Sequence, residues 1–175
     1  MVALVLSAAL FAGEVDLFGQ PVAPQLHGRP VLVLFSNDHT RETTTEAGSQ
    51  LALRLHDVPY VSVVRVDLRG LASFFSSIAT HEMKDAYEQS VQRTRTLYRD
   101  AGLPPPKSLG HTLVFIPDRD GHASAAVGLP KGFTEGLALV LAPDGHEVAR
   151  APFPSGVKKI EAALRAVPRR ARTKR

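Results

Sequence analysis

An adjacent acid and histidine, followed by two threonines, stand directly after the first strongly apolar stretch of the chain. Residues 30–35 read PVLVLF, and Asp38, His39, Thr40 and Thr43 come next. Aspartate and histidine beside a hydroxyl are the residue types of a nucleophilic site, in which a base activates the hydroxyl. Such a site also needs a group that orients the base and donors that hold an oxyanion, and the sequence shows neither. We therefore expect a helix cap and a polar loop here rather than a catalytic centre.

The absence of cysteine excludes several kinds of reactive and metal-binding site. None of the 175 residues is cysteine. This excludes disulfide bonds, thiolate nucleophiles, iron–sulfur clusters and zinc sites built from cysteine. It does not decide the compartment, because a protein without cysteine is compatible with either redox environment.

The remaining metal-ligating side chains are scattered along the chain. The seven histidines are His27, His39, His56, His81, His111, His122 and His146. His81 and Glu82 begin like a zinc-protease helix, but Asp85 stands where the second histidine is needed. Asp118 and Asp120 resemble the start of a calcium loop, but the required glycine and closing glutamate are missing, so turn chemistry explains them better. We predict no metal site and no cofactor; a composite histidine and aspartate site is the alternative.

Charge is concentrated at the C-terminal end. The formal net charge is +4, and the last eight residues, PRRARTKR, carry five positive side chains: Arg169, Arg170, Arg172, Lys174 and Arg175. Without these five residues the chain has 16 Lys and Arg and 17 Asp and Glu, so the rest of the chain is nearly neutral. We expect a solvated terminus, with contact to an anionic surface as the alternative. Nucleic acid is not expected, because no aromatic residue in the tail can stack on a base.

The first twelve residues, MVALVLSAALFA, carry no charge. They are too few to span a bilayer, which takes about 20 apolar residues. They resemble the apolar core of a secretory signal, with small residues at Ser7, Ala8, Ala9 and Ala12, although the positive leader is missing. We therefore divide the chain into a signal remnant or buried N-terminal segment (1–14), one domain (15–167) and a basic tail (168–175).

The elements of the domain follow from apolar runs and turn residues. Residues 30–35 and 60–68 have the apolar and β-branched character of core strands. A helix over 43–55 is predicted from Ala47, Leu51 and Leu55, with Thr43 and Glu46 at capping-box spacing. A second helix over about 71–101 carries apolar positions that include Leu71, Phe74, Phe75 and Ile78, with a break near 80–81, and GLPPP ends it.

Two similar units follow the long helix. Residues 112–121 and 136–145 each read as an apolar strand, then Pro-Asp and a turn glycine. Residues 146–150 continue the second unit as a hairpin partner, and residues 16–22 suggest a short N-terminal hairpin. Ser155 is expected to cap a final helix that ends at Pro168. The order β–α–β–α–β–β–α predicts an α/β fold with a central mixed sheet and helices on both faces.

This order, with VDLFGQPVAPQLHGRPVLVLF at its start and GLPKGFTEGLALVLAPDGHEVAR near its end, resembles the thioredoxin-like superfold, a three-layer sandwich. It is most similar to the branch of peroxiredoxins and secreted thiol-disulfide proteins. Peroxiredoxins carry Thr-x-x-Cys where this chain has Thr40-Arg41-Glu42-Thr43. Read against the Cys-x-x-Cys pair of thioredoxins, Thr40 and Thr43 take both cysteine positions. The resemblance thus implies the fold without its thiol.

A second departure concerns the cis-proline that thioredoxins place before a later strand. The matching position falls near Glu135 and Gly136, and neither is proline. Within the superfold the chain resembles the YtfJ-like family of exported bacterial proteins, some of which lack the cysteine pair. That resemblance implies a periplasmic or exported protein, with a cytoplasmic location as the alternative.

The sequence therefore predicts a redox-inactive, thioredoxin-like binding or scaffold module. Its contact surface is expected in the groove between residues 38–43 and 131–136, because this fold holds extended partner chains there. The candidate site residues are Asp38, His39, Thr40, Thr43, Glu135 and Gly136. The expected partner is another protein. The alternative is an enzyme of unknown type that uses His39 or a bound metal in the same loops.

Overall fold

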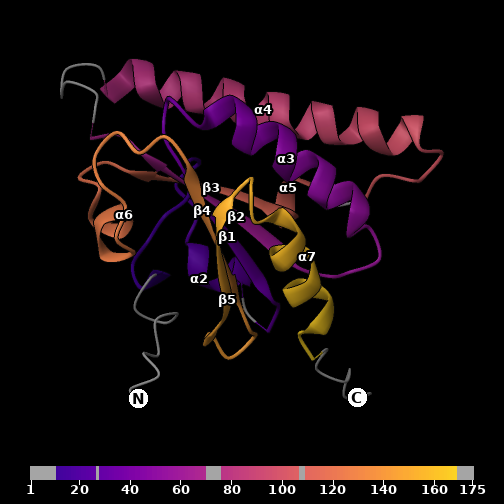
Figure 1. The fold of residues 1–175 in the computed structure, drawn as a ribbon. Coiled ribbons are helices and arrows are strands. Elements are labelled where there is room, and N and C mark those ends of the chain that lie inside the picture. Colours follow the sequence, from indigo (N-terminus) through magenta and orange to yellow (C-terminus); the bar gives the residue numbers. More distant parts are fainter. Residues whose placement is uncertain (1–10, 27, 70–75, 107–108, 169–175) are drawn as a thin grey trace.

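A five-stranded mixed sheet forms the centre of the protein (Figure 1). The computed structural model describes residues 11–26, 28–69, 76–106 and 109–168. The strands are β1 (Val31–Ser36), β2 (Val61–Asp67), β3 (Leu113–Asp118), β4 (Gly136–Leu141) and β5 (Glu147–Phe153). They lie in the order β3-β2-β1-β4-β5. β1, β2 and β3 are parallel, whereas β4 runs antiparallel to both β1 and β5.

Helices cover both faces of the sheet. α3 (Arg41–Arg54), α4 (Ser76–Asp100) and α7 (Val157–Ala166) pack on one face, and α2 (Val22–Leu26) and α6 (His122–Ala126) on the other. A short helix, α5 (Leu109–Thr112), leads into β3. The step from β1 to β2 and the step from β2 to β3 run in one direction across the sheet. Right-handed crossovers therefore bring α3 and α4 to the same face.

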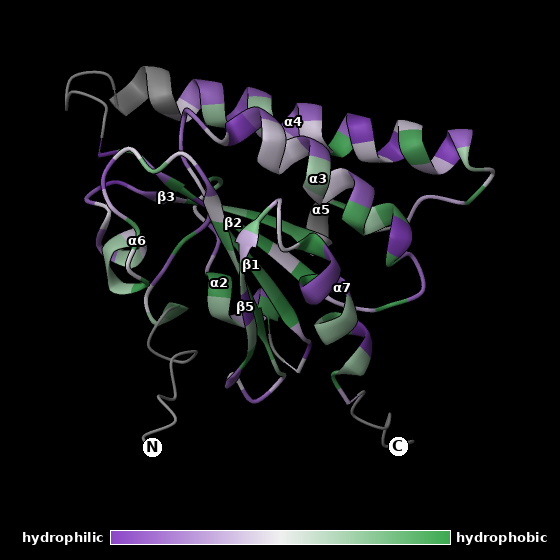
Figure 2. Cartoon of the chain, in the orientation of Figure 1, coloured by the Kyte–Doolittle hydropathy of each residue, from purple (hydrophilic) through white to green (hydrophobic). Residues whose placement is uncertain are grey.

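These features confirm the predicted fold class and the predicted order of the strands and of the three longer helices, whereas the short helices α2, α5 and α6 were not predicted. β1 is buried along its whole length, as its continuous apolar run predicted for a central strand (Figure 2). Alternate residues of β1, β2 and β3 point to two separate apolar clusters, one under α3, α4 and α7 and one under α2 and α6.

The predicted start of the first long helix is wrong. α3 begins at Arg41, two residues before the expected position. Thr43 consequently lies inside the first turn, and its hydroxyl donates a hydrogen bond to the carbonyl of Thr40 (3.0 Å) instead of capping free N–H groups. The capping box expected from Thr43 and Glu46 is therefore not formed.

Two further local expectations need correction. α4 continues through Thr80 and His81, where a break was expected. Gly156, not Ser155, precedes α7, and the Ser155 hydroxyl donates to the carboxylate of Glu135 instead of capping the helix. The apolar positions predicted for residues 71–75 and the side chain of Ile78 lie outside the described residues, and so does the basic tail at 169–175.

The N-terminal segment packs against the sheet from Phe11 onward. The suggested short hairpin is present in minimal form, since one antiparallel bridge pairs Val15 with Pro21 and the N–H of Asp16 donates to the carbonyl of Gln20 (2.8 Å). The N–H of Leu17 donates to the carbonyl of Phe115 (2.8 Å). Phe11 is buried, and Glu14 pairs with the guanidinium of Arg65. Within the described part of the chain, no helix combines the length and apolar character needed to span a membrane.

Candidate functional site

A buried network of polar side chains holds the junction between β1 and α3. Asn37 and Thr40 exchange two hydrogen bonds of 3.0 Å: the N–H of Asn37 donates to the Thr40 hydroxyl, and the N–H of Thr40 donates to the Asn37 side-chain oxygen. The hydroxyl oxygens of Ser36 and Thr40 lie 3.3 Å apart. Since Thr40 is only 2% exposed, its hydroxyl stabilises the turn and is not presented to solvent.

The same network joins the two loops that were predicted to form the groove. The side-chain amide of Asn37 donates to the backbone carbonyl of Phe133 at 2.7 Å. The 131–136 loop is thereby fixed beside the 38–43 loop. At its end, Gly136 begins β4 so close to β1 that an added Cβ would lie 2.7 Å from the carbonyl oxygen of Phe35. Only glycine fits this position without a shift of the backbone.

The six predicted site residues do not face a common point. Asp38, His39, Thr43 and Glu135 are exposed, whereas Thr40 and Gly136 are buried in the contacts described above. Among the residues that the structure describes, no three histidine, aspartate or glutamate side chains come together as a metal site would require. Asp118 accepts hydrogen bonds from the N–H (2.8 Å) and hydroxyl (2.7 Å) of Ser124, as the turn interpretation of this aspartate predicted.

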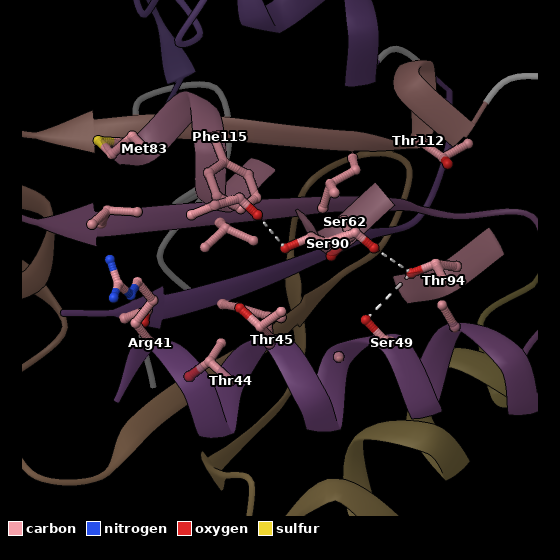
Figure 3. A pocket seen from close by; sticks show the side chains of 18 of the residues that line it. Arg41, Thr44, Thr45, Ser49, Ser62, Met83, Ser90, Thr94, Thr112 and Phe115 are labelled. Carbon is pink, nitrogen blue, oxygen red and sulfur yellow. Dashed lines mark hydrogen bonds between the residues drawn. The ribbon is translucent and has the colours of Figure 1, made fainter. Parts of the chain in front are cut away.

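A cavity that the sequence did not predict lies behind this edge. It has a volume of about 870 Å³ and extends between the sheet and the helices α3 and α4 (Figure 3). Asp38, His39, Arg41 and Lys131, all exposed, line it at the loop end. The opposite end is lined by residues that follow α3 and α4: His56, Asp57, Val58, Pro59, Tyr60, Pro106 and Leu109.

The walls of the cavity combine apolar side chains with hydroxyl groups. Leu34, Val64, Met83 and Phe115 contribute apolar surface from three strands and from α4. Hydroxyl-bearing residues come from both helices, from β1 and β2 and from α5: Ser36, Thr44, Thr45, Ser49, Ser62, Ser90, Thr94 and Thr112. The Thr94 hydroxyl donates to that of Ser49 (3.3 Å), which links α4 to α3 (Figure 3).

One of these hydroxyls has no partner. Thr44 is 3% exposed, and its hydroxyl oxygen forms no hydrogen bond with any residue that the structure describes. Buried hydroxyls are normally paired, since removing one from water without a partner is costly. The hydroxyl oxygen of Thr44 is not accessible and lies toward Gly136 at the start of β4, so it is a buried, unpaired group between α3 and the sheet and not one that is open to the cavity.

Tyr60 and Tyr98 mark the far end of the cavity. Burial raises the pKa of the Tyr60 phenol, and the neighbouring Tyr98 raises it further. The hydroxyl of Tyr98 donates to the carbonyl of Ala52 (2.9 Å), so this aromatic residue is fixed to α3. This end of the cavity is thus aromatic, and its phenols stay uncharged at neutral pH.

The sequence does contain a feature that indicates the cavity, but it lies in the small residues of the helices and not in their apolar positions. The helix predicted over 43–55 was recognised from its apolar positions, and these pack on the core. Its other sheet-facing positions carry small residues: Thr44, Thr45, Gly48, Ser49 and Ala52. Facing them on α4 are Ala86, Ser90 and Thr94. Small residues on two facing helices leave volume between the helices and the sheet.

Solved structures share this architecture. The chain is similar to peroxiredoxin Q of Xanthomonas campestris, with 15% identity, a TM-score of 0.54, and coverage of 91% of this chain and 94% of that one. It is similar to the exposed lipoprotein thioredoxin Etrx1 of Streptococcus pneumoniae, with 15% identity, a TM-score of 0.53, and coverage of 87% and 96%. An uncharacterized conserved protein of Geobacillus kaustophilus shares 12% identity, with a TM-score of 0.58 and coverage of 88% and 76%.

These similarities show the fold. No protein-family model matches the chain, and a search of curated proteins found no match. The resemblance inferred from the sequence is nevertheless confirmed at the level of the superfold, because both peroxiredoxin and thioredoxin structures align over most of the chain. The protein has a thioredoxin-like fold and lacks the cysteines on which thiol chemistry in that fold depends.

Proposed function

We propose that the protein is a redox-inactive, thioredoxin-like binding protein that holds another protein at the edge formed by residues 38–43 and 131–136. The observation that carries this proposal is the hydrogen bond from Asn37 to the carbonyl of Phe133. It ties the two loops together at the end of the sheet where the resembling families hold their reactive thiol.

The chemistry of this edge favours binding over reaction. A thiol is absent from the whole sequence, and the two threonines that take its positions have other roles. Thr40 is buried in the turn, and the Thr43 hydroxyl donates to the Thr40 carbonyl. What remains accessible is a set of side chains of both charges, Asp38, His39, Lys131 and Glu135, on loops of fixed geometry. Such a surface suits a polar contact with a partner chain.

A charge reversal that keeps the net charge tests the proposal. In the variant Asp38→Lys with Lys131→Glu, the charge at one position of each loop is reversed. The control is Asp144→Lys with Lys158→Glu, which exchanges exposed charges in the β4–β5 turn and on α7. Tagged proteins are crosslinked in the native host, purified and compared by quantitative mass spectrometry.

The expected result is a partner protein that is recovered with the wild type and the control but is depleted with the loop variant. Recovery of the same partner with the loop variant would place the contact elsewhere. A wild-type protein that purifies alone would remove the partner-protein function itself.

The proposal includes a location outside the cytoplasm. It is supported by the uncharged stretch MVALVLSAALFA and by the likeness to Etrx1, which is described as an exposed lipoprotein. Fractionation of host cells that express the full chain with a C-terminal tag tests it, and recovery with cytoplasmic marker proteins would contradict it. Membership of the YtfJ-like family stays a prediction.

A further inference from the structure

The cavity under α3 and α4 is larger than a packed core requires. Interiors of globular proteins hold few voids larger than a water molecule, whereas ligand sites commonly measure about 300–1,000 Å³. A volume of about 870 Å³ belongs to the second class. The cavity extends away from the loop surface proposed above to hold a protein partner, although the two share Asp38, His39, Arg41 and Lys131.

The shape of the cavity follows α3. Its lining runs from Arg41, the first residue of α3, to Ala52 in the last turn and on to His56. Fourteen residues of helix at 1.5 Å per residue give a length of about 21 Å. A ligand that fills this space is therefore long and narrow, which excludes a compact ring system or a nucleotide as the best fit.

The chemistry of the lining changes along that length. In the middle of the cavity, Leu34, Val64 and Phe115 contribute apolar surface on the sheet side, and hydroxyl-bearing residues of α3 and α4 face them. The far end is aromatic, with Tyr60 and Tyr98. At the loop end Arg41 and Lys131 are the cations and Asp38 and Glu82 are anions. Two further carboxylates of the lining are already paired, Asp67 with Arg69 and, at the far end, Asp57 with Arg165. A molecule with one charged end and one apolar end fits this order.

Arg41 is the group best suited to the charged end. It is the first residue of α3, so the positive end of the helix dipole lies beside it. Within the described part of the chain its guanidinium forms no ion pair or hydrogen bond, and Figure 3 shows it at one end of the row of lining side chains. A guanidinium can hold a carboxylate through two parallel hydrogen bonds.

The length of the cavity along α3, its apolar side chains and the guanidinium of Arg41 together define the ligand. From these observations we infer that the cavity binds a long-chain monocarboxylate, a fatty acid, with its carboxylate at Arg41 and its hydrocarbon chain between the sheet and α4.

Direct titration tests the inference. The full-length protein is unfolded in denaturant to remove bound lipid, refolded and titrated with cis-parinarate, a fluorescent fatty acid; palmitate and hexadecanol then compete for the site. We expect saturable binding of one molecule per chain, displaced more effectively by palmitate than by the uncharged alcohol. Arg41→Gln should weaken palmitate binding roughly tenfold or more, the loss expected for a charge-assisted pair. Lys158→Gln, an exposed control on α7, should leave it unchanged.

A second variant tests the location of the hydrocarbon chain. Thr45→Phe with Ala86→Phe places two rings in the cavity from α3 and α4, and circular dichroism verifies its fold. This variant should lose cis-parinarate binding while keeping the loop surface and its protein partner, so the two proposals can fail separately. Undiminished binding by the filled variant, or no binding by the wild type, would overturn the inference. Equal competition by palmitate and hexadecanol would overturn the role of Arg41.

Discussion

The two faces of the sheet are packed very differently, although the same strands build both. On the face covered by α2 and α6, the residues Val33, Val63 and Ile116 are completely buried. On the face covered by α3 and α4, their neighbours Ser62 and Val66 are only half-buried and line a large cavity. Adjacent positions of one strand thus point into a close-packed core on one side and into a cavity on the other.

The lengths of the covering helices do not explain the difference. α2 and α6 have five residues each, whereas α3 and α4 have 14 and 25. The face with the short helices is closed by large side chains, among them Phe11, Val22 and Leu26. The long helices instead direct small and hydroxyl-bearing residues at the sheet. Side-chain volume, and not helix length, decides which face is filled.

The largest effect is expected from truncating a leucine on each face. Leu139→Ala removes a fully buried side chain that packs under α2 and α6 and should cost about 3–5 kcal/mol of unfolding free energy. Leu34→Ala, on the cavity face, should cost about 2–3 kcal/mol, because Leu34 already has a cavity beside it and loses fewer packed neighbours. Urea unfolding of both variants after lipid removal measures the difference. Equal losses would mean that the cavity face is as closely packed as the other.

The opposite test enlarges a side chain on each face, at neighbouring positions of β2. Val63→Phe forces a ring into the close-packed face and should destabilise the protein by about 1–3 kcal/mol. Val64→Phe directs the same ring into the cavity and should change the unfolding free energy by less than about 1 kcal/mol. The two variants have identical composition and differ only in the face of the sheet on which the added ring lies. Comparable destabilisation by both, in parallel thermal and urea unfolding, would contradict the contrast between the faces.

Much of the fold could be predicted because continuous apolar runs in the sequence identify the core strands. The run at 30–35 differs from β1 (Val31–Ser36) by one residue at each end, and the stretch 60–68 contains β2. Helix ends were predicted less well. The start of α3 is set by side-chain hydrogen bonds between Asn37 and Thr40, which compete with the capping box that the spacing of Thr43 and Glu46 suggested.

The cavity could not be predicted by the same reasoning. Periodicity identifies which positions of a helix are apolar, but it does not measure the volume between a helix and a sheet. Recognising the cavity requires knowing that Ser49 on α3 meets Thr94 on α4 and that both helices lie on one face. The predicted site residues have a similar limit. The sequence assigned both Thr40 and Thr43 to the candidate groove, whereas the structure places Thr40 in the interior and only Thr43 at the surface.

The smallest predicted effect concerns the far end of the cavity, where burial raises the pKa of Tyr60. The phenol of the unfolded chain ionises near its ordinary pKa of about 10, while the folded protein keeps Tyr60 protonated to higher pH. The contribution of Tyr60 to stability is therefore complete below about pH 10 and is lost as the pH rises above it, by at most about 1.4 kcal/mol per pH unit.

Absorbance of tyrosinate can follow this ionisation cleanly, because the chain has three tyrosines and no tryptophan. Burial also raises the pKa values of Tyr87 and Tyr98, so the folded protein should show little tyrosinate just above pH 10. Tyr60→Phe should flatten the alkaline decline of the unfolding free energy relative to the wild type. If Tyr60 instead ionises near pH 10 in the folded protein, water reaches the far end of the cavity. The contrast between the faces would then be one of hydration as well as of volume, and an apolar ligand would have to displace that water to bind.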